Sequence, residues 1–86
     1  MTYRIELTPA AVRDLRKLPK DVLRRVHAVL VVLSETPRPP KAQRLVGELR
    51  EYLRVRVGDF RIVYLVEDDR LVVCVIRVRH RKDAYR

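Results

Sequence analysis

The sequence predicts one small α+β domain in which a helical hairpin packs on one face of a mainly antiparallel sheet. Three observations predict it: a short alternating segment opens the chain, two segments of helical apolar spacing follow, and three alternating segments joined by short turns close it. The element order is therefore β-α-α-β-β-β. Because the chain has 86 residues, we expect residues 1–86 to form a single domain around one core.

The first half of the chain is predicted to hold one strand and the helical hairpin. Alternating apolar and charged residues over 3–7 predict a short strand with one apolar face. Thr8 and Pro9 are typical of a helix N-cap followed by proline at the first helical position, so a short helix is expected to about Lys17. A second helix is expected over 19–35, with its apolar residues along one buried stripe.

The second half is predicted to be mostly strand. A proline-rich connector at 38–41 is expected to be exposed, and the weak pattern at 42–49 predicts a partial helical turn. Two-residue turns are expected at 58–59 and 68–69. The tail over 80–86 is short and polar. The three strands are expected over residues 51–57, 60–67 and 70–79.

The charge balance points to an anionic partner. The chain has 20 Lys and Arg against 11 Asp and Glu, a formal net charge of +9, and sixteen of the 20 basic residues are arginine. Arginine presents a planar fork of donors that matches phosphate, and a strongly basic chain attracts polyanions. Nucleic acid is the leading partner class, followed by an acidic protein and then by an anionic membrane surface.

Composition also argues against several kinds of protein. The longest fully apolar run, at 28–33, has six residues and is far too short to span a membrane, and the N-terminal residues contain no signal-peptide stretch, so a cytoplasmic protein is expected. Cys74 is the single cysteine, which excludes an intrachain disulfide and fits a reducing cytosol. His27 and His80 provide no metal-ligand spacing, and no glycine-rich phosphate loop is present, so neither a metal nor a cofactor is expected.

The register of the hairpin over 51–67 gathers arginines on one face of the sheet. A two-residue turn places Arg56 directly opposite Arg61, with Arg54 two residues along on the same side, while the other face is continuously apolar. Like charges in opposed positions are destabilising, and no acidic residue lies among these arginines. The pattern favours a phosphate-binding face, and an ordinary solvated strand face is the alternative left open.

The last ten residues add to this basic cluster. Because the last strand returns beside Arg61, its end is expected to meet the first cluster in space, and the tail is expected to bring His80 and Tyr85 there. The basic residues of this segment are Arg77, Arg79, His80, Arg81, Lys82 and Arg86.

Two segments, EYLRVRVGDFRIVY at 51–64 and VRHRKDAYR at 78–86, together resemble the RelE/ParE superfamily, the toxins of type II toxin–antitoxin modules. The likeness also takes in the helix junction at 17–19 and the segment 45–47. For RelE-like members it implies a β-α-α-β-β-β fold and metal-independent cleavage of mRNA on the ribosome, which inhibits translation. In that reaction a 2′-hydroxyl attacks the neighbouring phosphate and leaves a 2′,3′-cyclic phosphate. The resemblance also implies a cognate acidic antitoxin that forms a hetero-oligomer with the toxin.

The resemblance assigns roles to individual positions. Arg61 stands where the nuclease branch has an arginine that contacts the scissile phosphate, and Arg81 matches an arginine that assists the leaving group. Tyr85 matches a tyrosine that stacks on or orients the substrate nucleotide. Arg54 and Arg56 stand where the nuclease branch commonly has lysines, which is a departure from the family pattern.

This departure leaves the proton acceptor open. A lysine can lose its proton, whereas an arginine essentially cannot, because the pKa of a guanidinium exceeds about 12. Arg54 and Arg56 are therefore expected to bind substrate phosphate, together with Arg79 and Lys82. His80 is the candidate for proton transfer, because imidazole accepts and donates protons near neutral pH.

Two other functions stay open at this level. A ParE-like member would share the fold but bind and poison DNA gyrase without chemistry of its own, and the arginines in place of lysines keep that alternative open. A member that has lost its activity would act as a basic binding module. The joint presence of Arg61, Arg81 and Tyr85 favours the nuclease.

Overall fold

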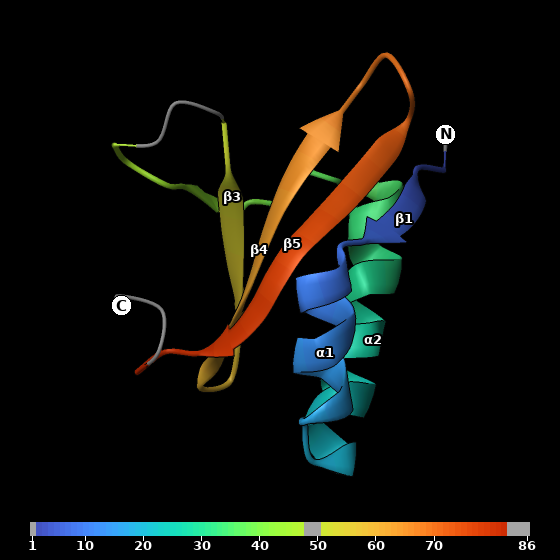
Figure 1. The fold of residues 1–86 in the computed structure, drawn as a ribbon. Coiled ribbons are helices and arrows are strands. Elements are labelled where there is room, and N and C mark those ends of the chain that lie inside the picture. The colour runs from blue at the N-terminus through green and yellow to red at the C-terminus, as the bar shows by residue number, and fades with distance from the viewer. Residues whose placement is uncertain (1, 48–50, 83–86) are drawn as a thin grey trace.

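Residues 2–47 and 51–82, which the computed structural model describes, form a five-stranded sheet with two helices packed on it (Figure 1). The strand order is β1-β5-β4-β3-β2, with β1 parallel to β5 and the other neighbours antiparallel. The predicted α+β class and mainly antiparallel sheet are confirmed. The elements are β1 (Arg4–Leu7), α1 (Pro9–Arg16), α2 (Lys20–Glu35), β2 (Gln43–Arg44), β3 (Leu53–Val57), β4 (Phe60–Glu67) and β5 (Val72–His80).

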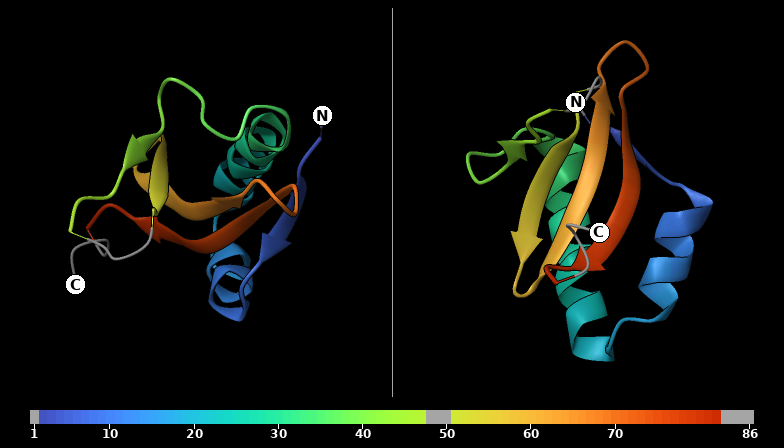
Figure 2. Two further views of the ribbon diagram at one scale, coloured as in Figure 1. Left: turned by 90° about the horizontal axis from the view of Figure 1, so that it is seen from above. Right: turned by 60° about the vertical axis from the view of Figure 1, so that its left-hand side comes forward.

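Both helices begin where the sequence predicts. The Thr8 hydroxyl accepts a hydrogen bond from the Ala11 N–H at 3.1 Å, and Pro9 occupies the first helical position. Helix α2 begins directly after Pro19 and ends at Glu35. In space α2 lies across the sheet, whereas α1 stands beside β1 and β5 (Figure 2). Within the described part of the chain, neither helix is long and apolar enough to cross a membrane.

The core lies between the helices and the apolar face of the sheet. Tyr64 is its largest fully buried side chain, and the Tyr64 hydroxyl donates to the Pro37 carbonyl at 2.8 Å. Burial raises the pKa of Tyr64 to about 12, so the phenol keeps its proton and this bond at neutral pH. Tyr64 thereby ties β4 to the connection that follows α2. The buried core residues are Ala11, Val26, Leu30, Leu33, Val55, Val57, Ile62, Tyr64, Val73, Val75 and Val78.

The hairpin between β3 and β4 has the predicted two-residue turn. Val57 pairs with Phe60 across Gly58 and Asp59. Gly58 has a φ of +61°, in the left-handed region that glycine adopts without a steric penalty. A tight turn of this kind fixes the register of both strands, so the arginines of β3 and β4 meet as expected.

Over residues 42–47, the described part of the range 42–49, the predicted partial helical turn is wrong. Gln43–Arg44 instead forms the short strand β2, which pairs antiparallel with the start of β3. The Leu45 N–H continues this contact by donating to the Tyr52 carbonyl at 2.9 Å. The edge of β3 supplies backbone partners that the local sequence does not reveal. Strand β3 itself begins at Leu53, two residues later than predicted.

The predicted two-residue turn at 68–69 is also wrong. Strand β5 begins at Val72, so the connection from β4 has four residues. Asp68 in this loop accepts a hydrogen bond from the Arg38 Nη2 at 2.8 Å and another from the Tyr3 hydroxyl at 2.8 Å. Hydrogen bonds from Arg38 and Tyr3 lower the pKa of Asp68 to about 2. The loop is therefore shaped by segments far away in the sequence.

A β-bulge that the sequence analysis did not predict lies in β5. Tyr64 pairs with Val75, but the preceding residue Val63 pairs with Arg77, so Ile76 is an extra residue in β5. Because side chains alternate along a strand, one extra residue exchanges the two faces of everything that follows it. The basic end of β5 is therefore placed by the bulge.

Candidate functional site

Arginines from three neighbouring strands lie in one row on the face of the sheet away from the core. Arg56 of β3 pairs with Arg61 of β4, and Arg61 pairs with Arg79 of β5. Directly opposed residues point to the same face, so these three side chains share one surface, which we name the arginine row. The structure thus brings together members of the two basic clusters that the sequence predicted to meet.

Arg61 is the most enclosed member of the arginine row. Its exposed fraction is 8%, and it is the only buried charged residue among those that the structure describes. Arg56 is exposed and Arg79 is half-buried. Because charges interact more strongly where water is excluded, an anion that reaches Arg61 is held more firmly than one at an open surface.

Arg54 is oriented by a residue that the sequence analysis did not single out. Gln43 lies opposite Arg54 across the β2–β3 pair, and the Arg54 Nη2 donates to the Gln43 Oε1 at 2.5 Å. The Arg54 Nη1 is buried and has no hydrogen-bond partner among the described residues, so an acceptor bound there would be favoured. Together with Lys41 and Arg56, these side chains line a hollow of about 360 Å³. No local signal could have identified Gln43, because its position depends on pairing with β3.

Arg81 is anchored beside the arginine row by the hairpin turn. Its backbone N–H donates to the Asp59 carbonyl at 2.7 Å, and its Nε lies 3.9 Å from the Asp59 carboxylate. Arg81 and Asp59 share with Arg56 and Arg61 a small hollow of about 80 Å³. One water molecule takes up about 30 Å³ in the liquid, so this hollow can admit a small oxyanion.

The ring of His80 lies on the opposite face of the sheet from the arginine row. His80 pairs with Phe60, and the two rings pack edge to face with centroids 5.3 Å apart. Because side chains alternate along β5, the His80 side chain points away from Arg56 and Arg61, although it lines a hollow of about 200 Å³ together with Arg77 and Arg79. The expected approach of His80 to Arg61 is therefore not found. The His80 Nδ1 accepts the Lys82 backbone N–H at 3.2 Å, so the proton of the neutral ring lies on Nε2.

Two predicted residues have no established contact with the row. The Lys82 side chain is exposed, and only the backbone of Lys82 forms the bond to His80 just described. Tyr85 lies outside the described residues, and so does the predicted basic residue Arg86.

Arg77 turns away from the arginine row because α1 binds it. Its Nε and Nη2 donate to the two carboxylate oxygens of Asp14 at 2.8 and 3.1 Å, and the Val78 N–H donates to the same carboxylate at 2.9 Å. Burial acts to raise the pKa of Asp14, but the hydrogen bonds from Arg77 and Val78 outweigh it and hold that pKa below its usual range. The hydrogen bond to Asp14 raises the pKa of Arg77 in turn.

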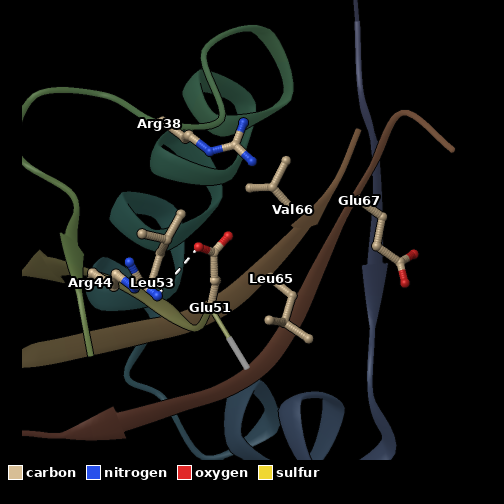
Figure 3. Close-up of a pocket in the computed structure, with 7 residues that line it drawn as sticks. All are labelled: Arg38, Arg44, Glu51, Leu53, Leu65, Val66 and Glu67. Atoms are coloured by element: carbon tan, nitrogen blue, oxygen red, sulfur yellow. Dashed lines mark ion pairs between the residues drawn. The ribbon is translucent and has the colours of Figure 1, made fainter. Parts of the chain in front are cut away.

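A larger hollow lies elsewhere. It measures about 470 Å³ and combines apolar side chains with charges of both signs (Figure 3). Arg38 and Glu67 on its walls are already paired, with Asp68 and Arg70 respectively. Arg44 and Glu51 at its rim already form an ion pair with a distance of 3.3 Å. The described residues also contain no group of three His, Cys, Asp or Glu side chains that could hold a metal ion. The arginine row is therefore the candidate site.

Comparison with known proteins agrees with this fold. A family model described as the ParE toxin of type II toxin–antitoxin system, parDE, matches residues 5–85. Toxin RelG from Mycobacterium tuberculosis is 35% identical, with 100% of this chain and 99% of that protein covered. The mRNA interferase toxin RelE from Escherichia coli K12 is 34% identical, with 99% and 92% covered. The archaeal RelE–RelB complex from Pyrococcus horikoshii contains a chain with a TM-score of 0.82 and 30% identity, covering 98% of this chain and 100% of that one.

The fold and the arginine row define a small basic α+β domain that presents arginines on one face of its sheet. The chain belongs to the RelE/ParE family and is a RelE-like toxin of a type II toxin–antitoxin module. Its relatives are named RelE and RelG, so the ParE-like alternative is not favoured.

Proposed function

We propose that this toxin cleaves mRNA through the arginine row. The observation that carries the proposal is the direct pairing of Arg56, Arg61 and Arg79 across three strands with no acidic residue between them. Such a surface is stabilised by a bound polyanion. The similarity to a protein named mRNA interferase toxin RelE supports RNA as that polyanion.

The proposed chemistry is an internal transfer at phosphorus. The 2′-oxygen of the ribose forms a bond to the adjacent phosphorus as its proton passes to a solvent water molecule, and the bond from phosphorus to the 5′-oxygen breaks. The departing 5′-oxygen takes up a proton from water, so the products carry a 2′,3′-cyclic phosphate and a 5′-hydroxyl and no proton is gained or lost overall. Negative charge builds on the phosphoryl oxygens in the transition state, and positioned guanidiniums stabilise it. Arg61 would bind the scissile phosphate, Arg81 would stabilise the departing 5′-oxygen, and Arg54, Arg56, Arg79 and Lys82 would hold the flanking phosphates. Guanidiniums supply the positive charge, so the proposed reaction needs no metal ion.

The proposal gives His80 only a small part in proton transfer. Arginine cannot accept the 2′-hydroxyl proton. The His80 ring packs on Phe60 away from the arginine row, and its Nδ1 is engaged by the Lys82 N–H. We therefore expect electrostatic stabilisation to supply most of the rate. Tyr85 stays the predicted residue for stacking on the substrate base.

The proposed inhibitor is an acidic antitoxin. The toxin has a formal net charge of +9, and a partner that covers the arginine row must neutralise it. The structurally similar Pyrococcus horikoshii protein is part of a RelE–RelB complex, which supports a hetero-oligomer with a cognate antitoxin.

The test is cleavage of mRNA on translating ribosomes by purified toxin, with and without EDTA, mapped by primer extension and by the chemistry of the new ends. We expect discrete breaks within codons, 2′,3′-cyclic phosphate ends, insensitivity to EDTA and much slower appearance of the breaks with Arg61→Met. Intact mRNA together with inhibited DNA supercoiling by gyrase would instead establish the ParE-like function.

A further inference from the structure

The bulge in β5 decides which residue completes the arginine row. Before the bulge, Tyr64 pairs with Val75. If that register continued without an extra residue, Arg61 would lie opposite Val78, and the arginines of β5 would point into the core. Because Ile76 is inserted, Arg61 lies opposite Arg79 instead. The composition of the site therefore depends on a single inserted residue.

Helix α1 and its cap contact β5 at the bulge and directly after it, along the edge that β1 leaves free. The Thr8 hydroxyl donates to the Ile76 carbonyl at 2.7 Å, and the Thr8 N–H donates to the Val75 carbonyl at 3.1 Å. Immediately after the bulge, Asp14 accepts the Val78 N–H at 2.9 Å and both donors of Arg77. Strand β1 pairs with β5 only as far as Val75, so Thr8 and Asp14 take over the edge of β5 where β1 ends.

The place of Asp14 in α1 also indicates a role outside the helix. It lies in the last turn, where a carboxylate is unfavourable because it faces the negative end of the helix dipole. Its side chain is nevertheless only 12% exposed and lies against β5. Asp14 destabilises its own helix, and its carboxylate is fully occupied by hydrogen bonds from β5. We infer that its role is to hold β5.

We propose that Asp14, assisted by Thr8, is a positioning residue that fixes the bulge and thereby holds Arg79 in the arginine row. Asp14 does not touch the RNA. It acts through Arg79 from the edge of the sheet, on the side where α1 stands. The activity readout of this inference rests on the proposed cleavage of RNA, whereas the register itself can be measured without it.

The experiment is a double-mutant cycle on single-turnover cleavage by the full chain. Misplacing a group by about 1 Å can cost about a hundredfold in rate, so Asp14→Ala should slow cleavage by about that factor. Asp14→Asn keeps one acceptor oxygen for the Val78 N–H and should recover part of the rate. In an Arg79→Ala background, Asp14→Ala should lower the cleavage rate only slightly further. In an Arg54→Ala background, it should lower the rate by the same factor as in the wild type. Asp21→Asn, which removes an exposed acid from the first turn of α2, is the matched charge control and should cleave at the wild-type rate.

A register measurement separates this inference from the proposed function. Amide exchange at Val78 should be slow in the wild type, intermediate in Asp14→Asn and fast in Asp14→Ala. In the wild type, titration with inorganic phosphate should shift the Arg79 Nε resonance, and in Asp14→Ala the shift should be lost. If the wild type binds phosphate in this way but cleaves no RNA, the proposed function fails and the positioning role stands.

Either of two outcomes would overturn the positioning role. In the first, Asp14→Ala exposes the Val78 amide while the phosphate response of Arg79 stays unchanged. In the second, the losses from Asp14→Ala are equal in the Arg79→Ala and Arg54→Ala backgrounds, which indicates a general loss of structure. Because Asp14→Asn retains one acceptor, it provides a folded variant for both measurements even if Asp14→Ala unfolds.

Discussion

At the scale of single residues, the members of the arginine row differ in environment although they share a chemistry. Arg61 is 8% exposed and lies between Arg56 and Arg79, its partners on the two neighbouring strands. Arg56 is exposed. A guanidinium that is shielded from water interacts most strongly with a developing charge. The central residue should therefore matter more for the reaction than its exposed neighbour.

Replacing Arg61 tests this difference. Arg61→Met keeps an unbranched apolar stem but removes the charge, and loss of one transition-state donor costs about 10² to 10³ in rate. Relief of the like-charge repulsion from Arg56 and Arg79 should offset the loss of the contacts that Arg61 makes, so the melting temperature should change by only a few degrees. Single-turnover cleavage and thermal denaturation measure the two effects, and Arg56→Met is the exposed counterpart, with a smaller expected loss. A melting temperature that drops by many degrees would show that Arg61 is a structural residue.

His80 gives a second prediction at this scale. Its ring faces away from the arginine row, so His80→Ala should lower the rate of the chemical step by less than about tenfold, against the factor of about 10² to 10⁴ typical of a general acid or base. The slope of the pH–rate profile near neutral pH should be the same in the variant and the wild type. A loss of several orders of magnitude together with a missing limb in that profile would reinstate His80 as the proton-transfer residue.

At the scale of elements, the sequence predicts what short-range chemistry determines. The Thr8–Pro9 cap, the start of α2 after Pro19 and the two-residue turn at Gly58 each depend on neighbours in the chain, and each lies where it was predicted. The hairpin register follows from that turn, so the positions of Arg54, Arg56 and Arg61 follow from local sequence. Arg79 is also expected near Arg61, but its exact pairing depends on the bulge.

The elements that could not be predicted depend on contacts between distant segments. Strand β2 exists because β3 offers an edge, and the loop after β4 is shaped by Arg38 and Tyr3. The bulge at Ile76 coincides with bonds from Thr8 and Asp14 across the fold, and no turn or glycine in the local sequence marks it. His80 is expected in the tail after the last strand, and its place as the last residue of β5, paired with Phe60, depends on the same contacts.

Acid titration of Asp14 gives a prediction for the contact between α1 and β5. The pKa of Asp14 is lower in the folded state than the value of about 3.9 in an unfolded chain, so the stabilisation is present above that value and is lost as pH falls through the folded pKa. Asp14→Asn should therefore lower the free energy of unfolding by about 1–2 kcal/mol at pH 7. Urea denaturation should show this difference shrinking below about pH 4. A difference that stays constant down to pH 2 would mean that the charge of Asp14 is not stabilising.

At the scale of the whole molecule, charge governs association. The formal net charge is +9, and the described acids Asp14, Asp59 and Asp68 all lie beside arginines. Along the strand pairs Arg56, Arg61 and Arg79 oppose one another directly, and of these acids Asp59 lies at the turn and Asp14 at the edge of β5, so the positive field is concentrated on one face of the sheet.

Salt dependence follows from this distribution. Binding to single-stranded RNA should weaken steeply with salt, with a slope of about −0.7 in log K against log [salt] for each phosphate contact. Arg56→Gln should reduce the magnitude of that slope by roughly one contact and leave the sequence preference unchanged. Lys20→Gln, at the start of α2, is the control and should leave the slope as it is. Affinity that is flat between low and physiological salt would argue for an apolar protein target.

The self-repulsion of the arginine row also makes the stability of the toxin depend on its occupancy. A ligand that binds only the folded state stabilises it by RT ln(1 + [L]/Kd). Every anion that binds the arginine row should therefore raise the free energy of unfolding. Inorganic phosphate should therefore raise the melting temperature of the wild type more than that of Arg61→Met, and an equal rise in both would contradict the link. An acidic antitoxin on this face would act in the same way. Its removal would release a molecule that is both active and less stable, so the period of toxicity would be limited by the toxin's own unfolding.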